Sequence, residues 1–342
     1  MGAAIASASR RPDPKPEPKL REDTIRRRDF IATTAATAAV AAFAGPSSAQ
    51  AYPDKPIRIV VPNPPGGSAD YIGRFFSGPL QRILGQPVAV ANVVGGGTSI
   101  GNRQVRDAAP DGHTVLAVHQ ALLTAATLKV MDFGPEAFAQ VAQVATEYVA
   151  VIVNRKAPYQ TLPQLLAAAK AGELNAGVQI GAINHFLFLS LGDATGTKFR
   201  YVNTGGGGPT RTALAGGHVD CAFLTVNEAK PLVDSGDLTI VALFAPQRLR
   251  SWPNLATARE QGTNLLLNLN YWWWMPKATP RDRVDRFAEA LRTAMGDPEI
   301  VQKMAEFNML PAFLKGAELE AEISRQYEQM KQLAARNNVT AS

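Results

Sequence analysis

The fold is decided by Ile57-Arg58-Ile59-Val60-Val61-Pro62-Asn63-Pro64-Pro65-Gly66-Gly67-Ser68-Ala69-Asp70. Its first five residues form a compact run rich in β-branched side chains, which predicts a buried strand, and the prolines and glycines that follow predict a loop. Apolar residues then recur at helical spacing as far as Leu84, and Ser68 or Asp70 can cap the start of that helix. A strand, a glycine-rich loop and a helix in this order favour an α/β protein.

The same order of elements recurs outward from this stretch. The strand runs are continuous rather than alternating, which favours a parallel sheet covered by helices on both faces. The simplest architecture has two α/β lobes, with 52–150 and 275–342 in the first lobe and 151–274 in the second. We expect strands at 88–93, 114–118, 148–153, 175–179, 200–203, 219–224 and 239–244, a helix at 162–171, and two or three closing helices within 278–308 and 316–337.

Glycine-rich loops follow three of the expected strands, at 62–70, 95–98 and 203–210. Glycine lets a ligand approach the backbone without a Cβ in the way. The helix after each loop begins with unpaired N–H groups and a partial positive charge, which suit a carboxylate or a phosphate. One such loop alone also fits simple close packing. Three of them in one α/β chain predict capture of an anion at the ends of the strands.

The four histidines give little support to metal or acid–base chemistry. His119-Gln120 ends a strand and Asn184-His185 opens a helix, so these pairs either line a cleft or cap their elements. His113 and His218 follow glycine in expected turns, and we expect them to be solvated. No two histidines stand at zinc-ligand spacing beside an acidic residue, so we expect no metal.

Signatures of nucleotide binding and catalysis are also missing from the sequence. No loop fits Gly-x-x-x-x-Gly-Lys-Ser/Thr or Gly-x-Gly-x-x-Gly, so we expect no cofactor. No Gly-x-Ser-x-Gly elbow is present, and Ser68 has no identifiable base partner. The formal net charge of +6 comes without a basic cluster interleaved with aromatic residues, which argues against a nucleic-acid partner.

Two further stretches are predicted to be buried. Cys221, the only cysteine, lies in a strand-like run and fits a small core residue. The run Tyr271-Trp272-Trp273-Trp274-Met275-Pro276 holds three of the four tryptophans. We favour a strand that crosses between the lobes inside the core. The alternative is that one ring faces the cleft and stacks on a ligand.

The first 51 residues have the pattern of an export signal. Arg27-Arg28 precedes a weakly apolar run at 31–45, and Ala49-x-Ala51 supplies the small residues that a signal peptidase requires. The arginine pair predicts a signal peptide of the twin-arginine type, and the alternative is an ordinary secretory leader with an accidental arginine run. We expect a mature chain that begins near Tyr52 and is located in the periplasm.

The mature part of the chain resembles a known family. The stretch Tyr52-Pro53-Asp54-Lys55-Pro56-Ile57-Arg58, followed by 61–70, is similar to the mature start of the substrate-binding proteins of tripartite tricarboxylate transporters, the Bug family. The resemblance covers 52–335 in order, and further matching stretches are 84–88, 109–114 and 215–220. It implies an α/β, two-lobed type II periplasmic-binding-protein fold with a ligand cleft between the lobes and no catalysis.

The resemblance also implies a small organic acid as ligand and membrane permease subunits as partners, and we expect a monomer. Two loops of the first lobe would grip a carboxylate with backbone N–H groups and hydroxyls, and the second lobe would add contacts. The ligand-binding residues that we expect are Asn63, Pro64, Gly66, Gly67, Ser68, Asp70, Gly97, Thr98, His119, Gln120, Asn184, His185, Thr204, Gly207 and Asn227.

Departures from the family pattern fall on these same loops. Asn63 stands where an aromatic residue is common, Ala69 where Thr is common, Asn203-Thr204 where Tyr-Lys is usual, and His119-Gln120 where small hydroxyl residues are usual. The fold therefore transfers better than the ligand, and citrate does not follow from the family's name. The rival functions are a carboxylate-sensing receptor of a two-component system and an exported α/β enzyme.

Overall fold

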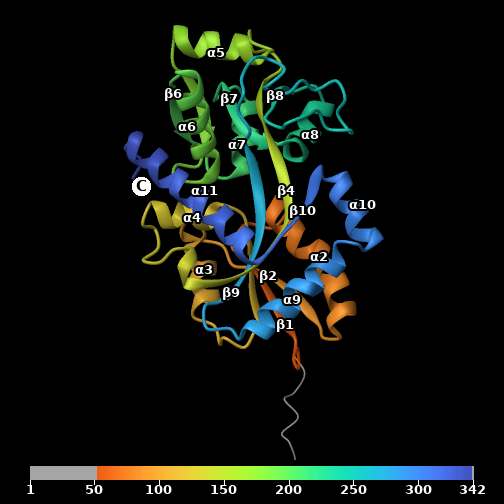
Figure 1. The fold of residues 1–342 in the computed structure, drawn as a ribbon. Helices are drawn as coiled ribbons and strands as arrows, with labels where there is room; N and C mark the ends of the chain where they lie inside the picture. The colour runs from red at the N-terminus through yellow and green to blue at the C-terminus, as the bar shows by residue number, and fades with distance from the viewer. Residues whose placement is uncertain (1–51, 341–342) are drawn as a thin grey trace, which may run out of the picture. The chain divides into compact units, whose positions relative to one another are not determined.

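One mixed sheet of ten strands runs through residues 52–340, the part of the chain that the computed structural model describes (Figure 1). The export signal predicted at 1–51, with Arg27-Arg28 and Ala49-x-Ala51, lies outside the described residues. The strand order is β2-β1-β3-β9-β4-β7-β5-β6, and β8 and β10 also pair with β4. The strands are β1 (Ile57–Val61), β2 (Val88–Asn92), β3 (Thr114–Val118), β4 (Phe138–Asn154), β5 (Leu174–Val178), β6 (Phe199–Asn203), β7 (Cys221–Thr225), β8 (Leu238–Leu243), β9 (Asn268–Pro276) and β10 (Met309–Leu314).

The long strand β4 joins two halves of this sheet. Its residues 138–148 pair with β9, and its residues 149–153 pair with β7. We call β1, β2, β3, β9 and β10 the first half, and β5, β6, β7 and β8 the second half. In Figure 1, β4 runs lengthwise from one half into the other, so the two halves share a single continuous strand.

The expectation of a parallel sheet is correct only for β1, β2 and β3 in the first half and for β5, β6 and β7 in the second, since β9 is antiparallel to β3. β1 is parallel to β2 and β3, and β5 is parallel to β6 and β7. β8, β9 and β10 run antiparallel to β4. For β9 the reason is the path of the chain, because a chain that leaves the first half along β4 must return in the opposite direction.

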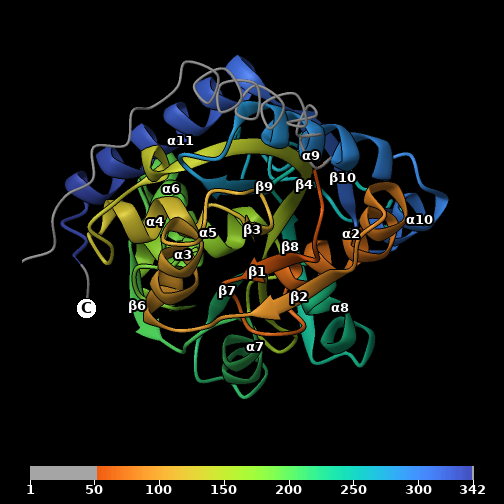
Figure 2. The ribbon, with the colours of Figure 1, turned by 90° about the horizontal axis from the view of Figure 1, so that it is seen from below.

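Helices surround the strands, and in Figure 2 α3 and α4 lie on one side of the first half while α2 and α10 lie on the other. The last helix, α11, contacts both halves, because its Leu333 and Ala334 form a buried cluster with Leu128 after α4 and with Phe186 and Leu189 of α6. The helices are α2 (Ser68–Leu84), α3 (Ser99–Arg106), α4 (Ala121–Thr127), α5 (Leu162–Ala171), α6 (Ile183–Thr195), α7 (Gly207–Ala215), α8 (Val226–Asp234), α9 (Arg281–Ala294), α10 (Pro298–Glu306) and α11 (Gly316–Arg336).

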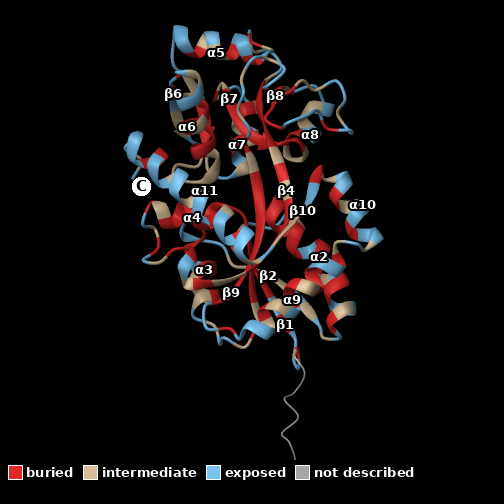
Figure 3. Ribbon diagram, in the orientation of Figure 1, coloured by how far each residue is buried: buried red, intermediate tan, exposed pale blue. Residues whose placement is uncertain are grey.

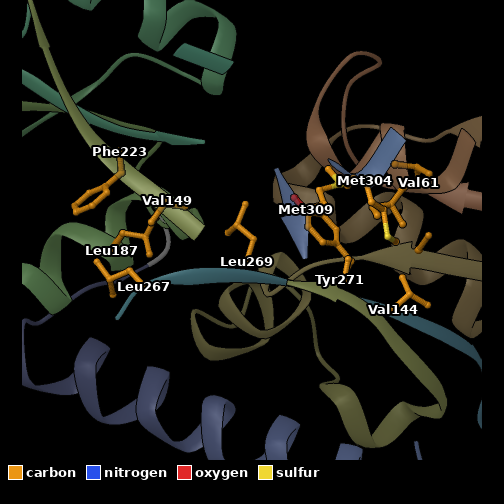
Figure 4. Close-up of a cluster of buried hydrophobic side chains, with 14 of the residues drawn as sticks. Val61, Val144, Val149, Leu187, Phe223, Leu267, Leu269, Tyr271, Met304 and Met309 are labelled. Carbon is orange, nitrogen blue, oxygen red and sulfur yellow. The ribbon is translucent and has the colours of Figure 1, made fainter. Parts of the chain in front are cut away.

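The buried core follows β4 and β9 (Figure 3). Trp272, Trp273 and Trp274 are all fully buried in β9, which confirms the prediction of a core strand at this run. Cys221 is fully buried as well, again as predicted. In Figure 4, Leu269 lies between a group of side chains that includes Phe223 and a second group that includes Tyr271. All three belong to one apolar cluster, so the core is continuous from one half to the other.

Two local predictions are wrong. His113 is buried rather than solvated, because its Nε2 lies 3.0 Å from the Asp54 carboxylate and the Tyr52 ring packs edge-on against it. Ser68 and Asp70 do not cap α2, because both already lie inside the helix and the N-cap position is Gly67. His218 is exposed, as predicted.

Some elements were not expected from the sequence. β4 begins ten residues before the expected strand at 148–153, and α4, α8 and β10 had no counterpart among the expected elements. Within residues 52–340, no helix combines the length and apolar character needed to span a membrane.

Candidate ligand-binding site

The first glycine loop is held in shape by Asp70. This buried carboxylate accepts hydrogen bonds of 2.9 Å from the Gly66 N–H, from Arg74 Nε and from Asn92 Nδ2. Burial opposes its ionisation, but the hydrogen bonds from Arg74, Gly66 and Asn92 outweigh burial and keep the pKa of Asp70 below its usual value. Asp70 therefore stabilises the loop by hydrogen bonds within the protein, and both of its carboxylate oxygens already accept hydrogen bonds from the chain.

The start of α2 leaves backbone donors at this loop. The N–H groups of Asp70 and Tyr71 both reach the Gly67 carbonyl, whereas the earlier N–H groups of the first turn have no carbonyl of the helix to bond. Pro64 and Gly66 are exposed. A Cβ built on Gly67 would meet only the Pro64 carbonyl oxygen, at 3.6 Å. The space above the first turn of α2 is thus open to a small anion.

Asn63 lies next to this loop with an unused acceptor. Its carbonyl accepts a hydrogen bond of 3.0 Å from Asn92 Nδ2. Its side-chain Oδ1 is buried and has no hydrogen-bond partner among the described residues. A ligand that brings a hydroxyl or N–H group to this loop would satisfy that oxygen.

The second glycine loop has a strained backbone. Gly95, Gly96 and Gly97 have φ values of 126°, 53° and 57°, and Thr98 follows them at φ 81°. The left-handed region is unfavourable for a β-branched residue, and such strain tends to persist at functional positions. Thr98 Oγ1 accepts a hydrogen bond of 3.1 Å from Asn102 Nδ2, which leaves the hydroxyl proton available to another acceptor.

His119 and Gln120 lie at the carboxyl end of β3. His119 Nδ1 accepts a hydrogen bond of 3.2 Å from the Ala121 N–H, and burial lowers the pKa of His119 to about 4, so the ring is neutral with its proton on Nε2. Gln120 bonds to the backbone of β9 twice, to the Asn268 carbonyl at 3.1 Å and from the Asn270 N–H at 3.0 Å. Gln120 thereby extends the pairing of β3 with β9, and its amide is occupied.

Asn184 and His185 stabilise the loop before α6. Asn184 Oδ1 accepts from the Gln179 N–H at 3.2 Å, and His185 Nδ1 accepts from the Gly181 N–H at 3.2 Å. His185 also lines a hollow of about 310 Å³ whose other lining residues are Ile180, Leu189, Tyr201, Asn337, Asn338, Val339 and Thr340. That hollow is bordered by the end of the chain, and neither glycine loop of the first half lines it.

The third glycine loop is largely engaged within the second half. Thr204 donates its N–H to the Val178 carbonyl at 2.8 Å, and its hydroxyl lies 2.7 Å from that of Thr210. A Cβ on Gly207 would lie 2.9 Å from Glu228 Oε1, so a side chain there would displace that carboxylate. The carboxylate of Glu228 thus already stands beside the start of α7, where a ligand anion was expected.

Asn227 connects the second half to the first. Its Oδ1 accepts from Asn308 Nδ2 at 2.9 Å, and its Nδ2 donates to the Phe307 carbonyl. The same Nδ2 lies 3.5 Å from Glu147 Oε1. Of the predicted residues of the second half, Asn227 is the one whose hydrogen bonds reach the first half.

Glu147 is the polar residue of this region that sequence reasoning missed. Its Oε2 accepts a hydrogen bond of 2.6 Å from the Tyr271 hydroxyl. Burial raises the pKa of Glu147 to about 8, against the effect of hydrogen bonds from the hydroxyls of Tyr271, Ser68 and Thr225, and the nearby Glu228 raises it further. A lone acid in β4 belongs to no motif, so its single signal was that it is the one charged residue of a mostly apolar strand.

Ser68 and Asn227 come together around Glu147, whereas Thr98 and His185 lie in separate clusters. Thr98 bonds to Asn102, and His185 packs on Tyr201 with ring centroids 4.3 Å apart. No group of three or more His, Cys, Asp or Glu side chains within residues 52–340 is arranged to hold a metal ion. The N–H groups of the first turn of α2 and the hydroxyl proton of Thr98 are donors of the kind that bind anions by hydrogen bonds.

Two half-sheets, each with a group of three parallel strands, are joined by the crossing strand β4, and glycine loops lead into their helices. This arrangement defines a two-lobed binding protein of the periplasmic class. The family model described as tripartite tricarboxylate transporter family receptor matches residues 72–339. The chain therefore belongs to this family of solute-binding proteins.

Curated relatives agree with this assignment. A UPF0065 protein of Agrobacterium vitis, from the TAR-I ttuE-ttuC' intergenic region, is 32% identical over 268 residues, which cover 76% of this chain and 77% of that protein. Protein BugT of Bordetella pertussis is 32% identical over 231 residues, which cover 66% of this chain and 71% of that protein.

Solved structures show the same two-lobed fold. The periplasmic binding protein BugD superposes with a TM-score of 0.76 at 26% identity, covering 85% of this chain and all of that one. MatC from Rhodopseudomonas palustris with bound malate has a TM-score of 0.72 at 23% identity, covering 82% and 99% of the two chains. An R. palustris protein with adipate has a TM-score of 0.75 at 21% identity, covering 84% and 99%.

Proposed function

We propose that this protein is exported to the periplasm, captures a small organic carboxylate between its lobes and delivers it to the permease subunits of a tripartite tricarboxylate-type transporter. Membership of the receptor family supports the binding role. The observation that carries the choice of a carboxylate is the first turn of α2, where the N–H groups before Asp70 have no helix carbonyl to bond and a Cβ on Gly67 would meet only the Pro64 carbonyl oxygen.

The chemistry of two structural neighbours points the same way. MatC holds malate and another neighbour holds adipate, and both ligands are dicarboxylates. None of the relatives or structures named above is described as a signalling receptor, so transport is the role that we propose. The predicted lobe boundaries (52–150 with 275–342, and 151–274), the monomeric state and the absence of catalysis belong to the same proposal.

The site that we propose has an anchor and a set of orienting groups. The anchor consists of the N–H groups at Gly67 and Ser68, and the Thr98 hydroxyl is a separate donor on the second loop. Asn63 Oδ1 and the neutral His119 ring are the orienting groups of the first half, because both have polar atoms that the chain leaves available. Asp70, Gln120 and Thr204 support the loops, since their polar atoms already bond to the chain.

The ligand class can be tested directly. Native mass spectrometry of freshly purified protein is expected to detect a co-purified organic acid. Calorimetry against mono-, di- and tricarboxylates, aromatic acids, amino acids and sugars is expected to find binding among the carboxylates alone. A sugar that binds more tightly than every acid would contradict the proposed function.

A further inference from the structure

Glu147 occupies the point of β4 at which the strand passes from one half of the sheet to the other. It is the last but one residue that pairs with β9, opposite Leu269, and from Val149 onward β4 pairs with β7. On its other edge Glu147 is opposite Met309 of β10. The side chain of Glu147 therefore lies at the junction of the two halves of the sheet.

Groups from both halves surround the side chain of Glu147, and the residue is 1% exposed. The first half contributes the Tyr271 hydroxyl at 2.6 Å and the Ser68 hydroxyl at the start of α2. The second half contributes the Thr225 hydroxyl and Asn227, whose Oδ1 bonds back to Asn308 of the first half. The enclosure of Glu147 in this structure therefore depends on groups from both halves.

No positively charged side chain is among the groups that influence the pKa of Glu147. α8 presents Glu228, which is negative, and β9 presents Tyr271, a neutral donor. Asp70 in the first turn of α2 is already paired with Arg74, and the β10 side presents Asn308 and Met309. An ionised carboxylate is costly to bury without a cation, whereas a neutral carboxyl group that is hydrogen-bonded on several sides is not.

We propose that Glu147 is a specificity-determining residue that must be uncharged for the two halves to close, so that this protein holds a carboxylate ligand only together with a proton on Glu147. The proposal rests on the proposed function in one respect, the nature of the ligand. A ligand carboxylate at the first turn of α2 would lie beside Ser68, and Ser68 contacts Glu147. An ionised Glu147 would repel it, whereas a protonated Glu147 does not.

The direction of the pH effect follows from the two states. In this structure burial raises the pKa of Glu147 from its ordinary value of 4.5 to about 8. A form with the halves apart would expose the carboxyl group on the side of Thr225 and Asn227 and would bring its pKa back toward the ordinary value. Between these values the closed form holds a proton that the open form lacks. Raising the pH through this window therefore opposes closure, by at most about tenfold in the closing equilibrium per pH unit, and the effect is constant above it.

Closure can be measured without a ligand. Spin labels attached at Lys170→Cys on α5 and Lys277→Cys after β9 report the distance between the halves, and the fully buried Cys221 is not available to the label. We expect the labelled protein to move from a short to a long distance as the pH rises to 9. Addition of Glu147→Gln is expected to keep the short distance at pH 9, and addition of Glu320→Gln, which removes an exposed acid of α11, is expected to leave the transition in place.

Calorimetry with malate and adipate tests the ligand side. Measured in two buffers of different ionisation enthalpy, binding to the wild type is expected to take up as much as one proton at pH 7 and to weaken toward pH 9, while binding to Glu147→Gln takes up none. Failure of every carboxylate to bind would contradict the proposed function and leave the distance result to decide the inference. Distances that are the same at every pH in the wild type and in Glu147→Gln, or release of protons when malate or adipate binds to the wild type, would overturn it.

Discussion

Gly67 is the loop residue at which ligand binding can be separated from folding. Its φ of −89° is available to any residue, and a Cβ would meet only the Pro64 carbonyl oxygen. We expect Gly67→Val to fold with wild-type stability and to lose at least about tenfold in carboxylate affinity, because the side chain would cover the N–H groups at the start of α2. Calorimetry with the identified acid, after thermal unfolding of the ligand-free variant, measures both effects.

The matched control for this substitution is Gly172→Val after α5. Gly172 also has extended backbone and no atom within 4 Å of an added Cβ, but it lies in the second half after the helix and not on a glycine loop. It is expected to leave affinity unchanged. Wild-type affinity in a folded Gly67→Val would assign the first glycine loop to the scaffold and move the site elsewhere.

At the residue scale, the sequence predicted the glycine loops but not what occupies their polar groups. Gly66 and Gly97 have positive φ values, which glycine adopts easily in turns, so the presence of glycine at these positions correctly indicated turns. The inward bonds of Asp70 and Gln120 depend on Asn92 and on Asn268, which are distant in sequence. Glu147 was missed for the same reason, because Ser68 and Tyr271 meet it only in the folded chain.

At the scale of a single element, β9 offers a comparison between two buried tryptophans. Trp272 Nε1 donates a hydrogen bond of 2.9 Å to Gln143 Oε1, whereas Trp274 Nε1 has no partner among the described residues. Both indoles are fully buried and their ring centroids lie 5.9 Å apart. We expect Trp272→Phe to destabilise the protein by about 1–3 kcal/mol more than Trp274→Phe, because it leaves the buried Gln143 oxygen unpaired.

Urea denaturation of the two variants measures this difference as a shift of the transition midpoint at constant slope. The loss of ring volume is the same in both, so it cancels in the comparison. If the two variants unfold at the same urea concentration, the hydrogen bond to Gln143 contributes nothing measurable to stability.

Elements with a strong local pattern were predicted from the sequence, and elements defined by their partners were not. The strand at 114–118 and the helix at 162–171 have the expected bounds. The strand expected at 148–153 begins instead at Phe138. The sequence did not indicate this earlier part, because the polar residues Gln140 and Gln143 interrupt its apolar pattern. Pairing with β9 holds both residues in the sheet. β10 escaped prediction because Met309–Leu314 gains its strand character from β4.

For the whole molecule, the predicted export route makes a specific demand on Arg27-Arg28. We expect replacement of both by lysine to prevent translocation by the twin-arginine route, because the guanidinium pair is the recognition element. Cell fractionation followed by detection of the protein in the periplasm measures the effect. Lysine at Arg10 and Arg11 is the control, since this second pair lies far from the apolar run and its replacement is expected to leave export unchanged. Undiminished periplasmic protein in the first variant would contradict the route.

The position of β9 between β3 and β4 has a consequence for how the chain reaches its fold. β3 and β4 are made early, yet they are neighbours in the finished sheet only through a strand that ends at Pro276. Until the ribosome has released that segment, both strands present unpaired edges, and the first half cannot complete its sheet during synthesis. Contacts between residues so distant in sequence also slow folding. A nascent chain of this protein therefore exposes aggregation-prone edges from the synthesis of β3 until that of β9, which favours chaperone protection over this interval.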